Sequence, residues 1–170
     1  MNLNNLSIIA AVDLNGGIGY NNNLLWYIPE DLKYFKKITL YKTIVMGKNT
    51  WLSLPIKPLP NRENVIISKT INIDKEKFPD IIIFRDFYSA LDYCLSKKNE
   101  CFFIGGESIY FKAIDYVDRV YLTYINKKAE LVNKFFPLEK IRDFYLCSEE
   151  KIWAQSISAE IYFRIYKRIK

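Results

Sequence analysis

The amino-acid sequence predicts an α/β fold in which one domain spans residues 1–170. Along the first two thirds of the chain, short apolar runs alternate with helical patterns, which is typical of parallel strands joined by crossover helices. The last third has three apolar segments without helices between them, which favours antiparallel strands. We therefore expect a mixed, mostly parallel central sheet of about eight strands, flanked by about four helices, with antiparallel C-terminal strands.

The expected elements follow in chain order from local sequence patterns. Runs of β-branched and aromatic residues predict strands over 6–12, 42–47, 63–68, 80–84, 101–104, 117–125, 143–152 and 159–168. Apolar residues at helical spacing predict helices over 29–40, 49–54, 88–97 and 106–114. No repeat, linker or low-complexity tract divides the chain, so one domain accounts for all of these elements.

Composition narrows the class of protein. No apolar run is long enough to cross a bilayer, and the opening segment MNLNNLSIIAAVD lacks the basic residues of a secretory signal, so we expect a soluble cytoplasmic protein. The net charge of +6 suits either a nucleic-acid partner or small anionic ligands. The positive residues are dispersed, and the densest cluster, KRIK, is typical of a solvated strand end.

Two residue types exclude whole classes of site. The chain has no histidine, which excludes histidine-containing catalytic triads and histidine zinc sites, so acid/base work falls to Asp, Glu, Tyr, Lys, Cys or water. Cys94, Cys101 and Cys147 are odd in number, lie in apolar segments and lack CxxC spacing. We expect all three to be small buried hydrophobes, with no disulfide framework and no metal site.

The segment LLWYIPEDLKYF places Asp31 at the start of a helix among aromatic and aliphatic residues. Pro29 suits the first helical position, and Glu30 complements the helix dipole. Asp31 could likewise be an acid that only stabilises the start of the helix. Asp31, however, shares a helical stripe with Leu32, Phe35 and Ile38, which we expect to be buried, whereas Lys33, Lys36 and Lys37 fall on the outer face. Desolvation of such an acid favours its protonated form and makes a role in proton transfer plausible.

Three loops follow predicted strands at the sheet edge where α/β proteins bind ligands, namely NGGIGYNNN, GKNT and GGES. Gly105 and Gly106 open a predicted helix and suit either a phosphate site or a simple turn. Lys48, Asn49 and Thr50 repeat this arrangement, and two such sites favour a dinucleotide. Lys48 and Lys69 suit an additional ribose phosphate, favouring NADP over NAD, or are solvated lysines. Arg62 suits a carboxylate ligand or is an isolated surface arginine.

Six segments in this order resemble the dihydrofolate reductase family from Leu6 to about Lys167. They are IIAAVDLNGGIGYNNNLLW, IPEDLKYFKKIT, VMGKNTWLSL, KPLPNRENVIIS, FFIGGESIY and VYLTYI. The resemblance implies a cytoplasmic monomer that reduces 7,8-dihydrofolate to tetrahydrofolate with NADPH, supporting one-carbon metabolism and thymidylate and purine synthesis. It implies a small-molecule substrate and neither a nucleic-acid nor a membrane partner.

The resemblance also implies roles for individual residues. Asp31 binds the pterin and promotes protonation of its imine nitrogen with support from Thr123, and the implied catalytic set is Asp31, Thr123, Trp26, Leu24 and Tyr110. The implied substrate-binding residues are Ile9, Asp31, Leu32, Phe35, Leu54, Lys57, Leu59, Arg62, Ile104 and Thr123. The implied cofactor-binding residues are Ala11, Gly17, Ile18, Gly19, Asn22, Lys48, Asn49, Thr50, Ser68, Lys69, Arg85, Gly105, Gly106, Glu107, Ser108 and Ile109. Residues Gly16 to Leu24 form a mobile segment over the site, here called the lid.

Three positions depart from the family pattern. Leu25 replaces the usual proline before Trp26, which leaves the exit of the lid less rigid. Lys48 replaces a common arginine and loses its planar fork, which implies weaker cofactor binding. Asn133 lies where many bacterial members have an acidic residue that holds the lid, so we do not expect that lid contact to be retained.

Three other functions are compatible with parts of the pattern. A pyrimidine-precursor reductase of riboflavin synthesis shares the fold and NADPH but does not need Asp31 with Arg62 beyond it. A basic nucleic-acid-binding module predicts steeply salt-dependent binding. A catalytically silent folate or nucleotide binder predicts binding without turnover.

Overall fold

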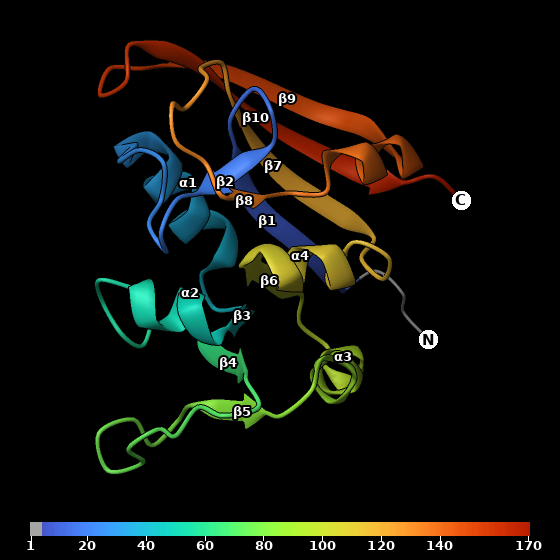
Figure 1. Ribbon diagram of the computed structural model, residues 1–170. Coiled ribbons are helices and arrows are strands. Elements are labelled where there is room, and N and C mark those ends of the chain that lie inside the picture. Colours follow the sequence, from blue (N-terminus) through green and yellow to red (C-terminus); the bar gives the residue numbers. More distant parts are fainter. Residues whose placement is uncertain (1–4) are drawn as a thin grey trace.

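The computed structural model describes residues 5–170, and its centre is one eight-stranded sheet (Figure 1). The strands of this sheet are β1 Leu6–Val12, β3 Thr43–Gly47, β4 Glu63–Ile67, β5 Ile82–Phe84, β6 Cys101–Gly105, β7 Arg119–Ile125, β9 Phe144–Ala154 and β10 Ala159–Arg168. Their spatial order is β5-β4-β3-β6-β1-β7-β10-β9. The first six strands of this order pair in parallel, and β10 pairs antiparallel with both β7 and β9. The predicted fold class is confirmed.

Four α-helices connect these strands, namely α1 Pro29–Thr39, α2 Lys48–Ser53, α3 Phe87–Ser96 and α4 Glu107–Ala113. The bounds of the predicted strands and helices differ from the observed ones by no more than two residues. Three short elements escaped prediction, namely β2 Gly17–Gly19, β8 Lys134–Phe135 and the 3-10 helix η1 Leu138–Asp143. They are too short for a periodic pattern. The prediction that the first four residues open no secretory signal falls outside the described residues.

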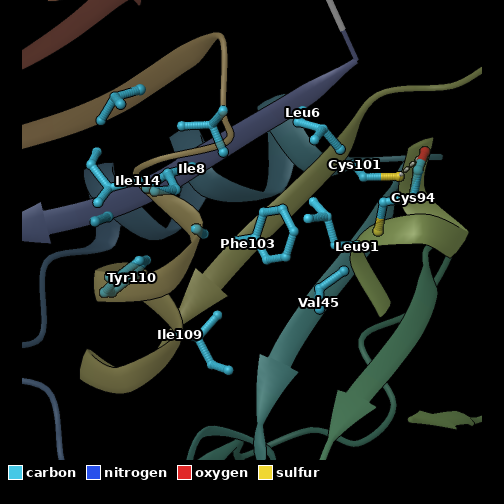
Figure 2. Close-up of a cluster of buried hydrophobic side chains, with 14 of the residues drawn as sticks. Leu6, Ile8, Val45, Leu91, Cys94, Cys101, Phe103, Ile109, Tyr110 and Ile114 are labelled. Atoms are coloured by element: carbon cyan, nitrogen blue, oxygen red, sulfur yellow. Dashed lines mark hydrogen bonds between the residues drawn. The ribbon is translucent and has the colours of Figure 1, made fainter. Parts of the chain in front are cut away.

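The two faces of the sheet are covered by different helices because side chains alternate along each strand. On one face, Ile8, Val45 and Phe103 pack with α3 and α4 (Figure 2). On the other, Ile9, Met46 and their neighbours pack with α1 and α2. A third cluster joins the C-terminal hairpin to α1 and the segment before it, and Tyr34 of α1 stacks on Phe163 of β10 with ring centroids 4.1 Å apart. These clusters fix the helix starts against the carboxyl ends of the strands.

The predicted buried stripe of α1 needs correction. Only Thr39 of this helix is fully buried, Phe35 and Ile38 are half-buried, and Leu32 is 39% exposed. The helix therefore rests on the sheet through its C-terminal half, and its first turn is less covered. Glu30 also differs from a simple surface acid, because its Oε2 atom is buried without a hydrogen-bond partner in the described structure.

The prediction for the cysteines is correct for two of the three. Cys94 and Cys101 are fully buried between α3 and the start of β6, where they lie side by side (Figure 2). Cys147 is exposed, so its predicted burial is wrong. The reason is that β9 is the outermost strand and exposes most of its residues. Within residues 5–170, no helix has the length and apolar character needed to cross a membrane.

Candidate active site

The site is built around one carboxyl group. Asp31 lies in the first turn of α1, which Pro29 begins, and its Oδ1 atom accepts a hydrogen bond of 2.7 Å from the hydroxyl of Thr123. Thr123 lies on β7 and is only 1% exposed, and it pairs with Ala11 of β1. A helix start and two central strands therefore fix the position of this acid. The two residues are 92 positions apart in the sequence, and the fold brings them together as the resemblance implies.

Burial dominates the electrostatics of Asp31. Desolvation raises the pKa of its carboxyl above the ordinary value, and the hydrogen bond from Thr123 acts in the opposite direction. Burial also raises the pKa of Tyr34 to about 12, with smaller contributions from Tyr121 and from the negative charge of Asp31. The same two effects, burial first and the Asp31 charge second, raise the pKa of Tyr110. The site thus holds an acid that takes up a proton more readily than an acid in water.

Apolar side chains predicted to contact the substrate share one cluster on this face of the sheet. The members are Ile9, Phe35, Leu54, Leu59 and Ile104, which come from β1, α1, the segment after α2, and β6. Ile9 is fully buried, whereas the other four keep part of their surface exposed. A partly exposed apolar wall beside a desolvated acid suits a flat heterocycle with polar edges.

The side chain of Tyr110 is buried and fixed by hydrogen bonding to the backbone of two strands. Its hydroxyl oxygen lies 2.8 Å from the carbonyl oxygen of Ile9 and 2.7 Å from that of Ile104, and the side chain is 5% exposed. With one proton, the hydroxyl donates to one carbonyl at a time. Tyr110 thereby ties α4 to the middle of β1 and the end of β6.

Arg62 has the features of an anion-binding residue. Its guanidinium donates to the carbonyl of Pro60 at 2.9 Å and to the hydroxyl of Thr39 at 3.2 Å, and it lies 5.9 Å from the ring centre of Phe35. No carboxylate of residues 5–170 forms an ion pair with it. Burial lowers the pKa of this guanidinium. A partly desolvated cation with unused donors favours a ligand carboxylate.

Lys57, also expected near the substrate, contacts the last turn of α2. Its ammonium group donates to the carbonyl of Leu52 at 3.1 Å. With Trp51 and Phe78 it lines a cavity of about 430 Å³ between α2 and the loop before β5. Asp31 is not among the residues that line this cavity.

Glycines bring two helix starts together. A Cβ atom built on Gly47 would lie 3.9 Å from the Gly105 carbonyl oxygen and 4.0 Å from the Gly106 nitrogen. Gly105 has φ +117°, and a Cβ there would lie 3.1 Å from the Tyr110 ring, so only glycine fits. A Cβ on Gly106 would meet the Thr50 hydroxyl at 3.5 Å. Side-chain-free backbone beside a hydroxyl is a cradle that fits a diphosphate.

Polar and cationic groups continue from this cradle along the ends of β3 and β4. The Lys48 ammonium lies 3.4 Å from the Thr70 hydroxyl, and Ser68 Oγ accepts from the backbone N–H of Ile71 at 3.0 Å. Arg85 donates to the carbonyls of Ser68 and Ile71. Lys48, Lys69 and Arg85 are exposed, so this edge presents free positive charge. Asn49 and Ser108 are also exposed at the two helix starts, whereas Ile109 belongs to the core.

The root of the lid depends on Asp13, a residue that the sequence analysis did not single out. Asp13 is 1% exposed, and its Oδ1 accepts from the backbone N–H groups of Asn15 at 2.9 Å and Gly17 at 2.7 Å. Its Oδ2 accepts from the N–H of Ala129 at 3.1 Å. One buried carboxylate thus ties the lid to the loop after β7. In the sequence, Asp13 could have been recognised as an acid that stands between an apolar strand and a glycine-rich loop.

The middle of the lid contacts the segment before β8. The Asn21 N–H donates to the Asn133 side-chain oxygen at 3.2 Å, and the Asn133 amide donates to the Asn21 side-chain oxygen at 3.1 Å. Asn21 and Asn22 have positive φ values of 48° and 64°, which asparagine tolerates. Asn133 therefore contacts the lid through a neutral amide, and the charged contact of many bacterial members is not present at this position. A neutral amide makes two hydrogen bonds there without a carboxylate.

The remaining lid residues have mainly structural contacts. A Cβ on Gly17 would lie 2.7 Å from Val132, and one on Gly19 would lie 2.9 Å from the Asn23 carbonyl oxygen, so both glycines allow close backbone packing. Ile18 packs against the core on the α4 side. Leu24 is 69% exposed. With Trp26 it lines a cavity of about 630 Å³ between the lid and residues 127–131.

Comparison with known proteins agrees with this geometry. A family model described as dihydrofolate reductase matches residues 5–168. The chain belongs to the dihydrofolate reductase family. The dihydrofolate reductase of Buchnera aphidicola subsp. Acyrthosiphon pisum is 39% identical over 142 residues, covering 83% of this chain and 84% of the relative. That of Bacillus subtilis is 37% identical, covering 86% and 83%, and that of Buchnera aphidicola subsp. Baizongia pistaciae is 31% identical, covering 98% of both chains.

The contact between Thr123 and Asp31 generates a first prediction. Thr123→Val keeps the shape of the side chain but removes the hydroxyl that lowers the Asp31 pKa. In this dihydrofolate reductase family member, we expect the pKa seen in the pH profile of kcat/KM to rise. We also expect kcat/KM to fall about tenfold, because a hydrogen bond to a charged group is worth roughly 1.5–3 kcal/mol. Thr123→Ser, which keeps the hydroxyl, is the control, and an unchanged profile in Thr123→Val would contradict the assignment.

The buried Asp13 carboxylate generates a second prediction. Asp13→Asn keeps one acceptor oxygen for Asn15 and Gly17 but turns an NH2 group toward the N–H of Ala129. We expect the free energy of unfolding to fall by about 1–3 kcal/mol in urea denaturation, as for other unsatisfied buried groups. Asp74, an exposed acid that accepts from the N–H of Glu76, gives the matched variant Asp74→Asn, with an expected loss under about 0.5 kcal/mol. Equal losses of unfolding free energy in the two variants would show that the hydrogen bond from Ala129 to Asp13 contributes no extra stability.

Proposed function

We propose that this chain reduces 7,8-dihydrofolate to 5,6,7,8-tetrahydrofolate with NADPH. The observation that carries the proposal is the desolvated Asp31 carboxyl, hydrogen-bonded to Thr123 beside a partly exposed apolar wall. Membership in the dihydrofolate reductase family supports it. A pyrimidine reductase or a nucleic-acid-binding module does not need this acid in this position.

Asp31 has two tasks in this proposal. As a carboxylate it accepts hydrogen bonds from the amino group and ring nitrogen of the pterin, which orients the heterocycle. Its raised pKa favours proton uptake, so that the substrate imine nitrogen is protonated through a water molecule near this acid. Protonation makes the adjacent imine carbon electron-poor. When bound, NADPH supplies the hydride that this carbon accepts.

The remaining substrate contacts follow from the arrangement of the wall. Ile9, Phe35, Leu54, Leu59 and Ile104 pack against the pterin and benzoyl portions, and the exposed part of Leu32 adds to this surface. Arg62 pairs with the glutamate carboxylate of folate through donors that no acid of residues 5–170 occupies. Lys57, whose ammonium group donates to the Leu52 carbonyl, is a further proposed substrate contact.

For NADPH, the glycine cradle and the cationic edge are the proposed contacts. Gly105, Gly106, Thr50 and the start of α4 surround the diphosphate, and Ala11, Ile18 and Tyr110 lie near the nicotinamide. Lys48, Ser68, Lys69 and Arg85 surround the adenosine and its phosphate, which favours NADPH over NADH. We further propose that the chain acts as one domain, as a monomer and in the cytoplasm.

The test of the proposed activity is NADPH oxidation that depends on dihydrofolate, measured with the chain and with Asp31→Asn. We expect the variant to lose about a hundredfold or more in kcat/KM at neutral pH, the range for loss of acid/base catalysis, and to recover partly at low pH, where the substrate arrives protonated. Activity only on a ribosylated aminopyrimidine, or unchanged turnover in the variant, would reject the proposal.

Folding of Asp31→Asn is checked by its stability. Because the native state raises the Asp31 pKa, it binds this proton more tightly than the unfolded chain does. Stability therefore falls as pH rises through the raised pKa, and a neutral asparagine avoids that loss. We expect the variant to melt at or above the wild-type temperature at pH 7, with the difference closing under acidic conditions.

Arg62→Ala tests the substrate orientation. We expect folate binding to weaken by about tenfold to a hundredfold, as for loss of a charge-assisted hydrogen bond, while NADPH binding stays unchanged. Lys69→Ala is the matched variant, which removes a positive charge after β4 instead of before it. We expect it to weaken NADPH binding and to leave the binding of folate and NADH unchanged. Fluorescence titration with each ligand measures both, and the reverse pattern would exchange the two assignments.

A further inference from the structure

The lid is attached to the protein through a small strand pair outside the main sheet. β2 pairs with β8, and neither strand joins the eight-stranded sheet (Figure 1). The Phe136 N–H donates to the Gly16 carbonyl at 2.8 Å, and the Asn133 N–H donates to the Gly19 carbonyl at 3.1 Å. One edge of β8 therefore carries the lid strand, and the position of the lid follows the position of β8.

The other edge of β8 is held by Glu107. The backbone N–H of Phe135 donates a hydrogen bond of 2.7 Å to Oε2 of Glu107. Both residues of β8 are exposed, and the next residue, Phe136, is buried with its ring centroid 5.3 Å from that of Tyr110. β8 is thus attached by the side chain of Phe136 at its end and by the charge-assisted hydrogen bond to Glu107 on its free edge.

Glu107 is also the first residue of α4 and directly follows Gly105 and Gly106. Its side chain therefore joins the cradle proposed for the diphosphate to the strand that holds the lid. Within residues 5–170, none of the ion pairs includes Glu107. Its negative charge therefore lacks an ion-pair partner there, and the residue that carries it directly follows Gly106, where an anionic ligand is proposed, so that like charges would repel.

We infer that Glu107 is a positioning residue that links the diphosphate cradle to the lid. Its hydrogen bond to Phe135 holds β8, and its charge weakens the binding of a dinucleotide at Gly105 and Gly106. The charge effect rests on the proposed function, because it needs a dinucleotide at this site. The hydrogen bond to β8 does not depend on the proposed function. Since a coupling between two sites is reciprocal, a ligand that repels the carboxylate also acts on the strand that this carboxylate holds.

The tie to β8 is tested by amide hydrogen exchange on the ligand-free protein. Glu107→Ala removes the acceptor, and we expect exchange to become about three- to tenfold faster in residues 16–23 and 133–136 while the rest of the chain is unchanged. Glu107→Gln keeps an acceptor oxygen and is expected to restore exchange close to wild type. Glu130→Gln removes a charge from the exposed loop that precedes β8 and is expected to change neither region. Unchanged exchange in Glu107→Ala would overturn the tie.

The charge effect is tested by NADP+ titration, followed by protein fluorescence. Glu107→Gln is expected to bind NADP+ about three- to tenfold more tightly than wild type, and the gain is expected to shrink in high salt, which screens charges. Glu130→Gln is expected to bind like wild type. Equal affinities of Glu107→Gln and wild type would overturn the charge effect. Absence of NADP+ binding by the wild type would overturn the proposed cofactor and the charge effect together, and the exchange experiment would still decide the tie.

Discussion

The desolvation of one carboxyl group is the constraint on which this structure depends. Asp31 is half-buried, and within the described residues its one side-chain hydrogen bond comes from Thr123, so desolvation outweighs this bond and its pKa rises. A fully satisfied carboxylate would be more stable and less basic. The fold therefore maintains an acid at a cost to its own stability, which is the pattern of a functional site rather than of a helix start.

The topology explains how such a site is maintained. Parallel strands β3, β6 and β1 end at the same edge of the sheet, and the segments that follow them supply Gly47, Gly105 and the lid. Tyr110 bonds to carbonyls in the middle of β1 and at the end of β6 and so holds α4 on the sheet. Because each group lies on a strand end or a helix start, core packing on both faces positions the acid and the glycine cradle together.

The sequence predicted the regular elements well because each long strand or helix has its own pattern. Pro29 marks the start of α1, and the runs around Ile8 and Phe103 mark buried strands. It failed where contacts between distant segments decide the outcome. Cys147 lies in an apolar run but on an outermost strand, and Leu32 follows the helical stripe but is 39% exposed. The role of Asp13 depends on an N–H that lies 116 residues away, which no local pattern contains.

The residues expected to act on the substrate could be predicted from the sequence, whereas the contacts of the lid could not. The resemblance implies the roles of Asp31 and Thr123, whereas the contacts that hold the lid are seen only in the structure, namely Asp13 at its root, the Asn21 and Asn133 amides at its middle, and Glu107 through β8. A neutral amide pair responds little to salt, whereas Glu107 carries a charge beside the diphosphate cradle. Within the described residues, the lid strand and β8 are thus held by two carboxylates, Asp13 bonded to β2 and Glu107 bonded to β8, and only Glu107 directly follows the glycines of the cradle. An anion bound at the cradle would act on the lid through this residue.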